Sequence, residues 1–194
     1  MTLQEMKYKI LRLIEETNED TTYTDDPDIQ LKLNDVINQV MFELARMKKI
    51  PEKLEQDYTE EYIELHGLEY NLKDIENFYQ LDNIRFTDLS GTEREIDVNM
   101  NYYKIPEAGH ITIYYYKYPE RIDDDTTDSE YVFELSDDAL EILPYGAAAD
   151  ILKSDVSNSY GQIYQQRYET MLQRLDSRYN TGSVYIEANG MELI

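Results

Sequence analysis

The sequence contains no cysteine, which excludes a disulfide framework, a thiolate zinc site and a cysteine nucleophile. Histidine is scarce, with 2 residues, and the 7 glycines form neither GxGxxG nor GxxxxGK[ST], the loops that cradle nucleotide phosphates. The GxSxG motif of serine hydrolases is missing as well. We therefore predict that the chain is not an enzyme and has no cofactor.

Positive charge is also scarce. The 18 Lys and Arg residues stand against 41 Asp and Glu, so the formal net charge is −23. DNA and anionic lipid are both recognised by basic surfaces, and neither is an expected ligand of this chain. No apolar run reaches the roughly 18 residues of a membrane-spanning helix. Residues 1–16 also lack the unbroken apolar region of a signal peptide, so we expect neither a membrane anchor nor a secretion signal.

Tyrosine is the abundant aromatic residue, with 19 copies against 4 phenylalanines and no tryptophan. Its side chain is large and amphipathic, which suits surfaces that are wet before assembly and buried after it. Tyrosine is also favoured in β-strands for reasons of packing alone. Both explanations remain open at the level of sequence.

Apolar residues at helical spacing predict a helix within residues 1–16 and a longer one over residues 29–44. The triplet Asp26-Pro27-Asp28 marks the start of the second helix, because Asp26 can cap free amides and Pro27 fits the first turn. Pro51 is expected to follow its end. The short polar connection, 17–24, predicts that the two helices fold against each other.

The apolar period then changes to two, which predicts β-strands. We expect strands at 58–65, 83–89, 93–98 and 111–118, with hairpin turns at 90–91 and 107–109. The last strand is the clearest. Its residues Ile111, Ile113 and Tyr115 are predicted to face one side of the sheet, and Thr112, Tyr114 and Tyr116 the other.

Two further helices are predicted near the C-terminus. Ser136 is a suitable N-cap for the first, and the small residues 146–149 would let another helix approach it closely. Pro144 is expected to kink this helix. The second carries a stripe of tyrosines and aliphatic residues, and an apolar tail follows it.

These elements together predict an α+β fold. We expect an antiparallel helical bundle of two N-terminal and two C-terminal helices, an inserted antiparallel β-sheet subdomain and an extended C-terminal tail. The predicted boundaries are 1–56 for the N-terminal helices, 57–120 for the β insertion, 121–134 for an acidic loop, 135–180 for the C-terminal helices and 181–194 for the tail.

The acidic loop partly matches a calcium-binding loop. Asp123, Asp125, Thr127 and Glu134 stand where positions one, three, five and twelve of such a loop would be. Position six is Asp128, where that loop requires glycine. We therefore interpret the segment as a flexible acidic loop and predict no metal site.

Three parts of the sequence resemble the head-to-tail connector proteins of tailed bacteriophages, which are also called adaptor, head-completion or neck proteins. They are the N-terminal helix pair opening MTLQEM, the strand end YYYKYP at 114–119, and the closing helices that begin LSDDAL and continue LPYGAAADIL. The tyrosines of the last helix follow. The resemblance spans most of the chain and rests on the order of its features.

The resemblance implies a structural virion protein at the neck of the particle, made in the cytoplasm of the bacterial host. It implies a ring, usually of twelve copies, that lies beneath the portal protein, contacts a stopper or tail protein and surrounds the DNA channel. DNA would pass without specific binding, since an acidic wall repels phosphate. The family's C-terminal segments reach the portal, which here would involve Val184, Tyr185, Ile186, Met191, Leu193 and Ile194.

A ring also needs contacts between neighbouring subunits, and surplus tyrosines are candidates for them. These are Tyr114, Tyr116, Tyr118, Tyr160, Tyr164 and Tyr168. Two other functions remain open: a different neck protein, such as a stopper or tail terminator, and an acidic regulatory protein that mimics DNA. A β-dominated fold without the final helix pair would favour a stopper or tail terminator.

Overall fold

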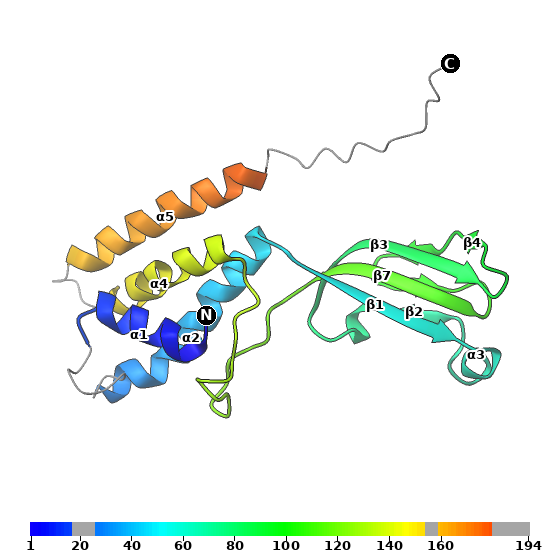
Figure 1. Cartoon of the computed structure of the whole chain (residues 1–194), viewed down its shortest axis with the longest axis horizontal. Helices are drawn as coiled ribbons and strands as arrows, with labels where there is room; N and C mark the ends of the chain where they lie inside the picture. The colour runs from blue at the N-terminus through cyan, green and yellow to red at the C-terminus, as the bar shows by residue number, and fades with distance from the viewer. Residues whose placement is uncertain (17–25, 154–158, 180–194) are drawn as a thin grey trace, which may run out of the picture.

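The computed structural model describes residues 1–16, 26–153 and 159–179, which form a helical part and a β part placed end to end (Figure 1). Both ends of the chain contribute to the helical part. Its helices are α1 (Leu3–Leu13), α2 (Pro27–Met47), α4 (Asp137–Leu152) and α5 (Ser159–Tyr179). The β part comprises β1 (Ile50–Tyr58), α3 (Glu60–His66), β2 (Glu69–Asn71), η1 (Leu72–Asp74), β3 (Phe78–Asp88), β4 (Glu93–Arg94), β5 (Asp97–Asn99), β6 (Tyr102–Lys104) and β7 (Gly109–Lys117). The predicted α+β class is confirmed.

Capping side chains fix where the first two helices begin. At α1, the Glu5 amide donates to the Thr2 hydroxyl, and the Thr2 amide donates to the Glu5 carboxylate, at 3.2 and 2.9 Å. At α2, Asp26 Oδ1 accepts from the Asp28 amide at 2.8 Å. Pro27 occupies the first turn, so the start signal predicted for α2 is confirmed.

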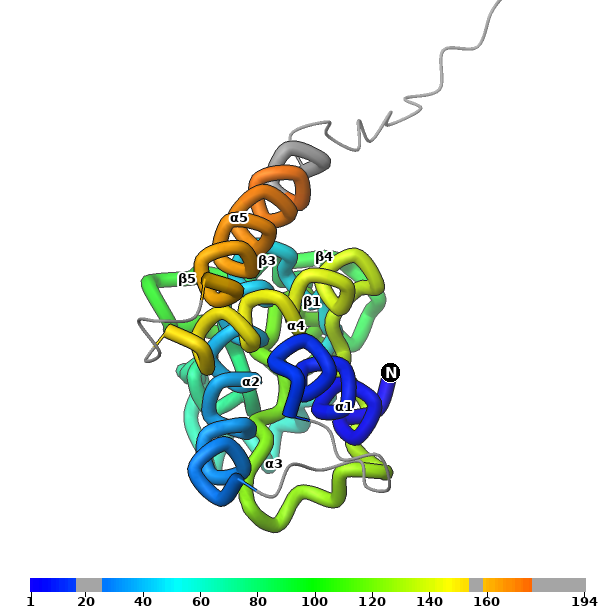
Figure 2. Tube along the Cα trace, turned by 90° about the vertical axis from the view of Figure 1, so that its left-hand side faces the viewer, coloured from blue at the N-terminus to red at the C-terminus, as the bar shows by residue number. Residues whose placement is uncertain are grey.

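Helix α4 is the centre of the helical core, since α1, α2 and α5 all pack against it (Figure 2). The close approach of α5 depends on Gly146, because a Cβ there would lie 2.7 Å from the Tyr168 ring. This agrees with the prediction from the small residues of α4. Ser136 stands at the N-cap of α4, but its buried hydroxyl has no hydrogen-bond partner in the described part of the chain. Pro144 lies within α4.

The β part has its own core between two antiparallel sheets. The larger sheet has the order β1-β7-β3-β4 and the smaller one β2-β6-β5. The alternation predicted for β7 is confirmed, with Ile111, Ile113 and Tyr115 buried in this core. Phe86 of β3 and Tyr103 of β6 complete its centre.

The sequence misassigned the entry into the β part. Residues 50–56 were expected with the N-terminal helices, yet β1 begins at Ile50 and pairs with β7 over its whole length. Pro51 is tolerated because β1 is an edge strand, where one missing amide donor breaks no ladder.

The strand predicted at 58–65 is also wrong beyond Tyr58. Helix α3 occupies this stretch, and the Thr59 hydroxyl caps it by accepting from the Tyr62 amide at 3.1 Å. The single strand predicted at 93–98 is instead two short strands, β4 and β5, which belong to different sheets.

The acidic loop is fastened to the helical part, which its interpretation as a flexible loop did not anticipate. The Lys7 ammonium contacts the Asp128 carboxylate at 2.8 Å. The buried Asn38 side chain donates to the Ile122 carbonyl at 2.6 Å and accepts from the Ile122 amide at 2.9 Å. These contacts hold the start of the loop against α2 and its middle against α1.

Within the described ranges, no helix combines the length and apolar character needed to cross a membrane.

Candidate interaction surfaces

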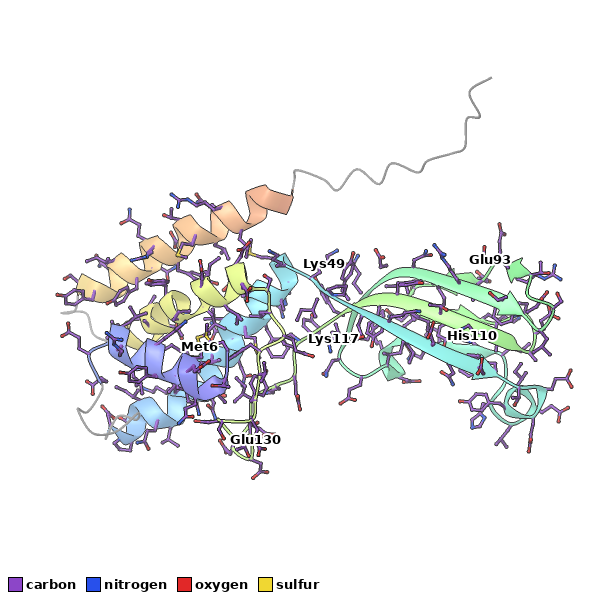
Figure 3. The ribbon with its side chains drawn as sticks, in the orientation of Figure 1. Met6, Lys49, Glu93, His110, Lys117 and Glu130 are labelled. Atoms are coloured by element: carbon purple, nitrogen blue, oxygen red, sulfur yellow. The ribbon has the colours of Figure 1, made fainter. Side chains whose placement is uncertain are left out.

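The outer face of the larger sheet carries Tyr114 and Tyr116, both half-buried on the central strand β7. Cations from the neighbouring strands flank the first ring. Lys53 Nζ lies 5.9 Å and the Arg85 guanidinium carbon 5.8 Å from the Tyr114 centroid. Lys49 Nζ lies 4.7 Å from the Tyr116 ring, close to where the helical and β parts join (Figure 3). Such cation–π contacts keep the rings in place at an open surface.

We call this surface the tyrosine face, defined by Tyr114, Tyr116, Lys49, Lys53 and Arg85. It exposes amphipathic rings and three cations, of which Lys53 pairs with Glu55. The Tyr116 hydroxyl donates to the exposed Asp82 carboxylate at 3.2 Å. Partly exposed tyrosines contribute contact area at low entropic cost when a partner covers them. The geometry therefore suits the tyrosine face to protein–protein contact.

Tyr118 has a different position, at the junction between the two parts of the chain. Its ring centroid lies 5.4 Å from that of Phe42 on α2 and 4.7 Å from that of Tyr79 on β3. The Arg46 guanidinium lies 6.0 Å from the same ring. Tyr118 therefore contributes to packing between the helical and β parts.

The three tyrosines of α5 differ in exposure. Tyr160 is 52% exposed and remains a surface candidate. The half-buried Tyr164 donates its hydroxyl to the Leu13 carbonyl at 2.8 Å, which ties α5 to α1. Tyr168 is only 5% exposed and donates to a Glu43 carboxylate oxygen at 2.8 Å. Burial raises the pKa of Tyr168, and the hydrogen bond to Glu43 adds to this effect.

Tyr168 is thus a core residue, and its prediction as an interface residue is wrong. The helical spacing placed it on the same stripe as Tyr160, but the inward side of that stripe packs on Gly146. The six predicted tail residues, Val184, Tyr185, Ile186, Met191, Leu193 and Ile194, lie outside the described residues.

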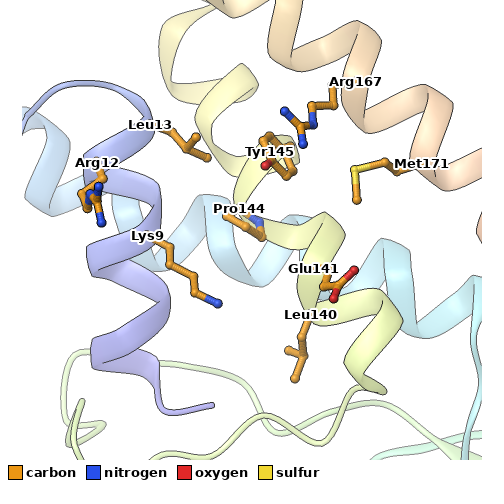
Figure 4. A pocket seen from close by; sticks show the side chains of 9 residues that line it. All are labelled: Lys9, Arg12, Leu13, Leu140, Glu141, Pro144, Tyr145, Arg167 and Met171. Atoms are coloured by element: carbon orange, nitrogen blue, oxygen red, sulfur yellow. The ribbon is translucent and has the colours of Figure 1, made fainter.

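Sequence reasoning missed a groove between α1, α4 and α5, with a volume of about 440 Å³ (Figure 4). Its wall is apolar and its edges carry three cations and one carboxylate. The lining residues are Lys9, Arg12, Leu13, Leu140, Glu141, Pro144, Tyr145, Arg167 and Met171. The Arg167 guanidinium carbon lies 4.2 Å from the Tyr145 centroid, so this cation is held over the groove wall.

A second hollow of about 430 Å³ lies beside the core of the β part. Tyr58 and Tyr103 line it, and their hydroxyls are 2.7 Å apart in a mutual hydrogen bond. Tyr70 lines it as well, and burial raises the pKa of this tyrosine to about 12. The Tyr70 hydroxyl donates to the Gly67 carbonyl at 2.7 Å. All three hydroxyls therefore have hydrogen-bond partners, and the hollow is the margin of a packed core.

The two histidines lie apart on the β part. His110 Nδ1 is 2.7 Å from the exposed Asp57 carboxylate, and the His66 ring stacks on Tyr62 with centroids 4.1 Å apart. In the described part of the chain, no three His, Asp or Glu side chains are grouped to hold a metal ion. Asp123, the first candidate calcium ligand, accepts hydrogen bonds from Thr126 and from the Asp125 amide.

Comparison with known proteins assigns this chain to no family. No protein-family model matches the chain, and no curated protein matches it. The functional interpretation therefore depends on the fold, on the tyrosine face and the groove, and on the resemblance noted in the sequence.

Proposed function

We propose that this chain is a structural protein of a tailed-phage virion, the adaptor between head and tail. It would form a ring, of twelve copies by the family's pattern, beneath the portal protein and around the DNA channel. The observation that carries the proposal is the chain order. Helices from both ends of the sequence pack on α4, and an antiparallel β part is inserted between α2 and α4.

That order is the one expected from the resemblance, in which the helical part is an antiparallel bundle. The closing pair α4 and α5 favours an adaptor over a stopper or tail terminator, for which we expected no such pair. A role in assembly, with no catalysis and no cofactor, is part of the proposal.

Ring assembly requires two different surfaces on each subunit, because each copy contacts one neighbour on either side. The groove lies on the helical part and the tyrosine face on the β part, so the chain has more than one surface suited to contact. The C-terminal tail, residues 181–194, would dock on the portal, and a stopper or tail protein would bind the opposite side of the ring.

The net charge of −23 also fits a DNA conduit. A wall that repels phosphate lets the duplex move without adhering to it. Retention of DNA by the assembled ring that weakens with added salt would contradict this part of the proposal.

The proposal is tested by cryo-electron microscopy of phage particles that contain this chain, or of the chain mixed with the portal protein of the same phage. We expect a ring of this chain at the head–tail junction, with the segment after α5 lying on the portal. A chain absent from particles, and monomeric in the presence of the portal, would contradict the adaptor function.

The same net charge favours one second candidate, an acidic protein that occupies a basic DNA-binding partner. This function predicts a monomer or dimer whose binding to a basic protein weakens steeply with added salt, because the surface charges become screened. Binding that persists at high salt would count against it.

A further inference from the structure

We propose that the groove between α1, α4 and α5 receives the exposed face of α2 from a second copy of the chain, with Leu31 inserted into it. This inference rests on the proposed ring, since it supplies the contact between neighbouring subunits. We identify the occupant by comparing the charge and shape of the groove with those of the α2 face around Leu31.

The groove combines an apolar floor with positive edges. Leu140 and Pro144 of the floor are buried, while Lys9, Arg12 and Arg167 are exposed at the edges. The ion pairs found in the described part of the chain do not include these three cations. Glu141 adds one carboxylate to the same lining. The groove therefore suits an apolar side chain flanked by more than one carboxylate.

The exposed face of α2 has this composition. Leu31 is 78% exposed, although leucine is usually a core residue. Asp28 precedes it by three positions and Asp35 follows it by four, so both exposed carboxylates lie beside it on one helical face. Helical geometry places this face about 180° from the buried stripe that contains Leu33 and Ile37.

The two surfaces lie on different sides of the helical part. A view into the groove shows α1, α4 and α5 in front, with α2 passing behind α4 (Figure 4). The outward face of α2 and the groove cannot meet within one chain, because α4 stands between them. A contact between them joins two copies head to tail, and repetition of that contact by a rotation closes a ring.

The contact has the features of a small anchored interface. One leucine fills an apolar pocket, and two carboxylates meet three cations around it, which fixes the orientation of the neighbour. The charge pairing is also selective, since the remainder of this acidic chain would be repelled by another copy.

Disulfide trapping in the full chain tests the contact, and the native sequence contributes no cysteine to confuse it. A chain carrying Leu31→Cys and Met171→Cys should form a ladder of linked oligomers under oxidising conditions. The matched control carries Leu31→Cys and Gln173→Cys, because Gln173 is exposed on the side of α5 away from the groove. Equal cross-linking in the two chains would overturn the proposal.

Charge reversal tests the chemistry. Adding Arg12→Glu and Arg167→Glu to the trapping chain should reduce the linked fraction about tenfold. The exposed pair Lys73→Glu and Lys104→Glu, on the β part, changes the net charge equally and should leave the fraction unaltered. Restoration of cross-linking by Asp28→Lys and Asp35→Lys, added to the groove reversals, would support the pairing. If neither the groove reversals nor the compensating reversals on α2 change the linked fraction, the proposed contact is overturned.

The same chains, assembled into particles, separate this inference from the adaptor function. A neck ring in which the Met171→Cys groove links to the portal or a tail protein, and not to a second copy, overturns the inference alone. A ladder in solution from a chain that is absent from particles supports the contact between copies and overturns the adaptor function.

Discussion

At the scale of single residues, Asp88 shows how one carboxylate organises a turn. It accepts hydrogen bonds from the Ser90 hydroxyl at 2.5 Å, the Thr92 amide at 2.9 Å and the Arg94 guanidinium at 3.0 Å. These donors, the Ser90 hydroxyl foremost, lower the pKa of Asp88 to about 2. The ionised form is therefore favoured more strongly in the folded chain than in the unfolded chain.

A carboxylate with a lowered folded pKa stabilises the fold above its unfolded pKa, and the contribution is lost as the pH falls through the folded value. We therefore expect Asp88→Asn to destabilise the chain at neutral pH, with the difference from the native chain shrinking between about pH 4 and about pH 2. Urea unfolding across this range measures the difference. Glu93→Gln, a change at an exposed neighbour, is the control, and a difference that is constant with pH would contradict the expectation.

Gly146 is the second residue whose role is decided by contact distances. A Cβ at this position would lie 2.7 Å from Tyr168 Cε2 and 3.0 Å from Val40 Cγ1. We expect Gly146→Ala to lower the free energy of unfolding by about 1–3 kcal/mol through overpacking, although alanine is the better helix former. In the control Gly161→Ala, the nearest atom is Leu152 Cβ at 3.2 Å, so the loss measured by urea unfolding should be smaller. Equal losses of unfolding free energy in the two variants would show that the close contact with Tyr168 does not make Gly146 special.

At the scale of elements, helix starts could be predicted because a cap acts within a few residues. Asp26 and Pro27 identified the start of α2 from local sequence alone. Strand β1 could not be predicted in this way, since its polar sequence becomes a strand only by pairing with β7, far along the chain. Alternating apolar residues suggested a strand where Thr59 in fact caps the short helix α3.

The groove was missed for a related reason. The spacing of Lys9 and Arg12 on one helix is visible in the sequence, but their meeting with Arg167 requires the packing of α1 and α5 on α4. Leu31 did give a local signal, because it falls outside the apolar stripe predicted for α2. Exposure of an apolar residue becomes informative only when the surface that could cover it is known.

The loop between β7 and α4 is held against α1 by the ion pair of Lys7 and Asp128, and this contact can be tested. Lys7 is 9% exposed and pairs with Asp128, and the Gln4 amide donates to the Asp128 carbonyl at 3.0 Å. We expect Lys7→Met to leave a partly buried carboxylate without its cation and to cost about 1–3 kcal/mol. Amide hydrogen exchange should increase in Gln4 and Tyr131, whose amides bond across this contact and within the loop.

Lys9→Met serves as the control for this change. Lys9 is exposed on the same helix, and its ammonium donates to the Met1 sulfur at 3.7 Å. The substitution should therefore leave the exchange of Gln4 and Tyr131 unchanged. Similar exchange in the Lys7→Met and native chains would mean that the backbone contacts alone hold the loop.

At the scale of the whole molecule, the chain has two separate hydrophobic cores. The helical core includes Leu143 of α4, and the β core includes Phe86 of β3. The chain passes between the parts twice, once before β1 and once after β7 (Figure 3). Lys117 and Glu134, 2.6 Å apart, and the ring pair of Phe42 and Tyr118 bridge this junction. Since each core is complete within its own part, we expect either core to open while the other stays packed.

We therefore expect core truncations to act on one part at a time. Phe86→Ala should cost about 3–5 kcal/mol and Leu143→Ala about 2–5 kcal/mol, because both side chains are fully buried. Phe86→Ala should accelerate amide exchange in β1, β3 and β7 while α2 and α4 keep their protection, and Leu143→Ala should do the reverse. Hydrogen exchange read by mass spectrometry resolves the two parts. Equal acceleration throughout the chain would show that the junction couples the cores into one cooperative unit, because opening either core would then require opening both.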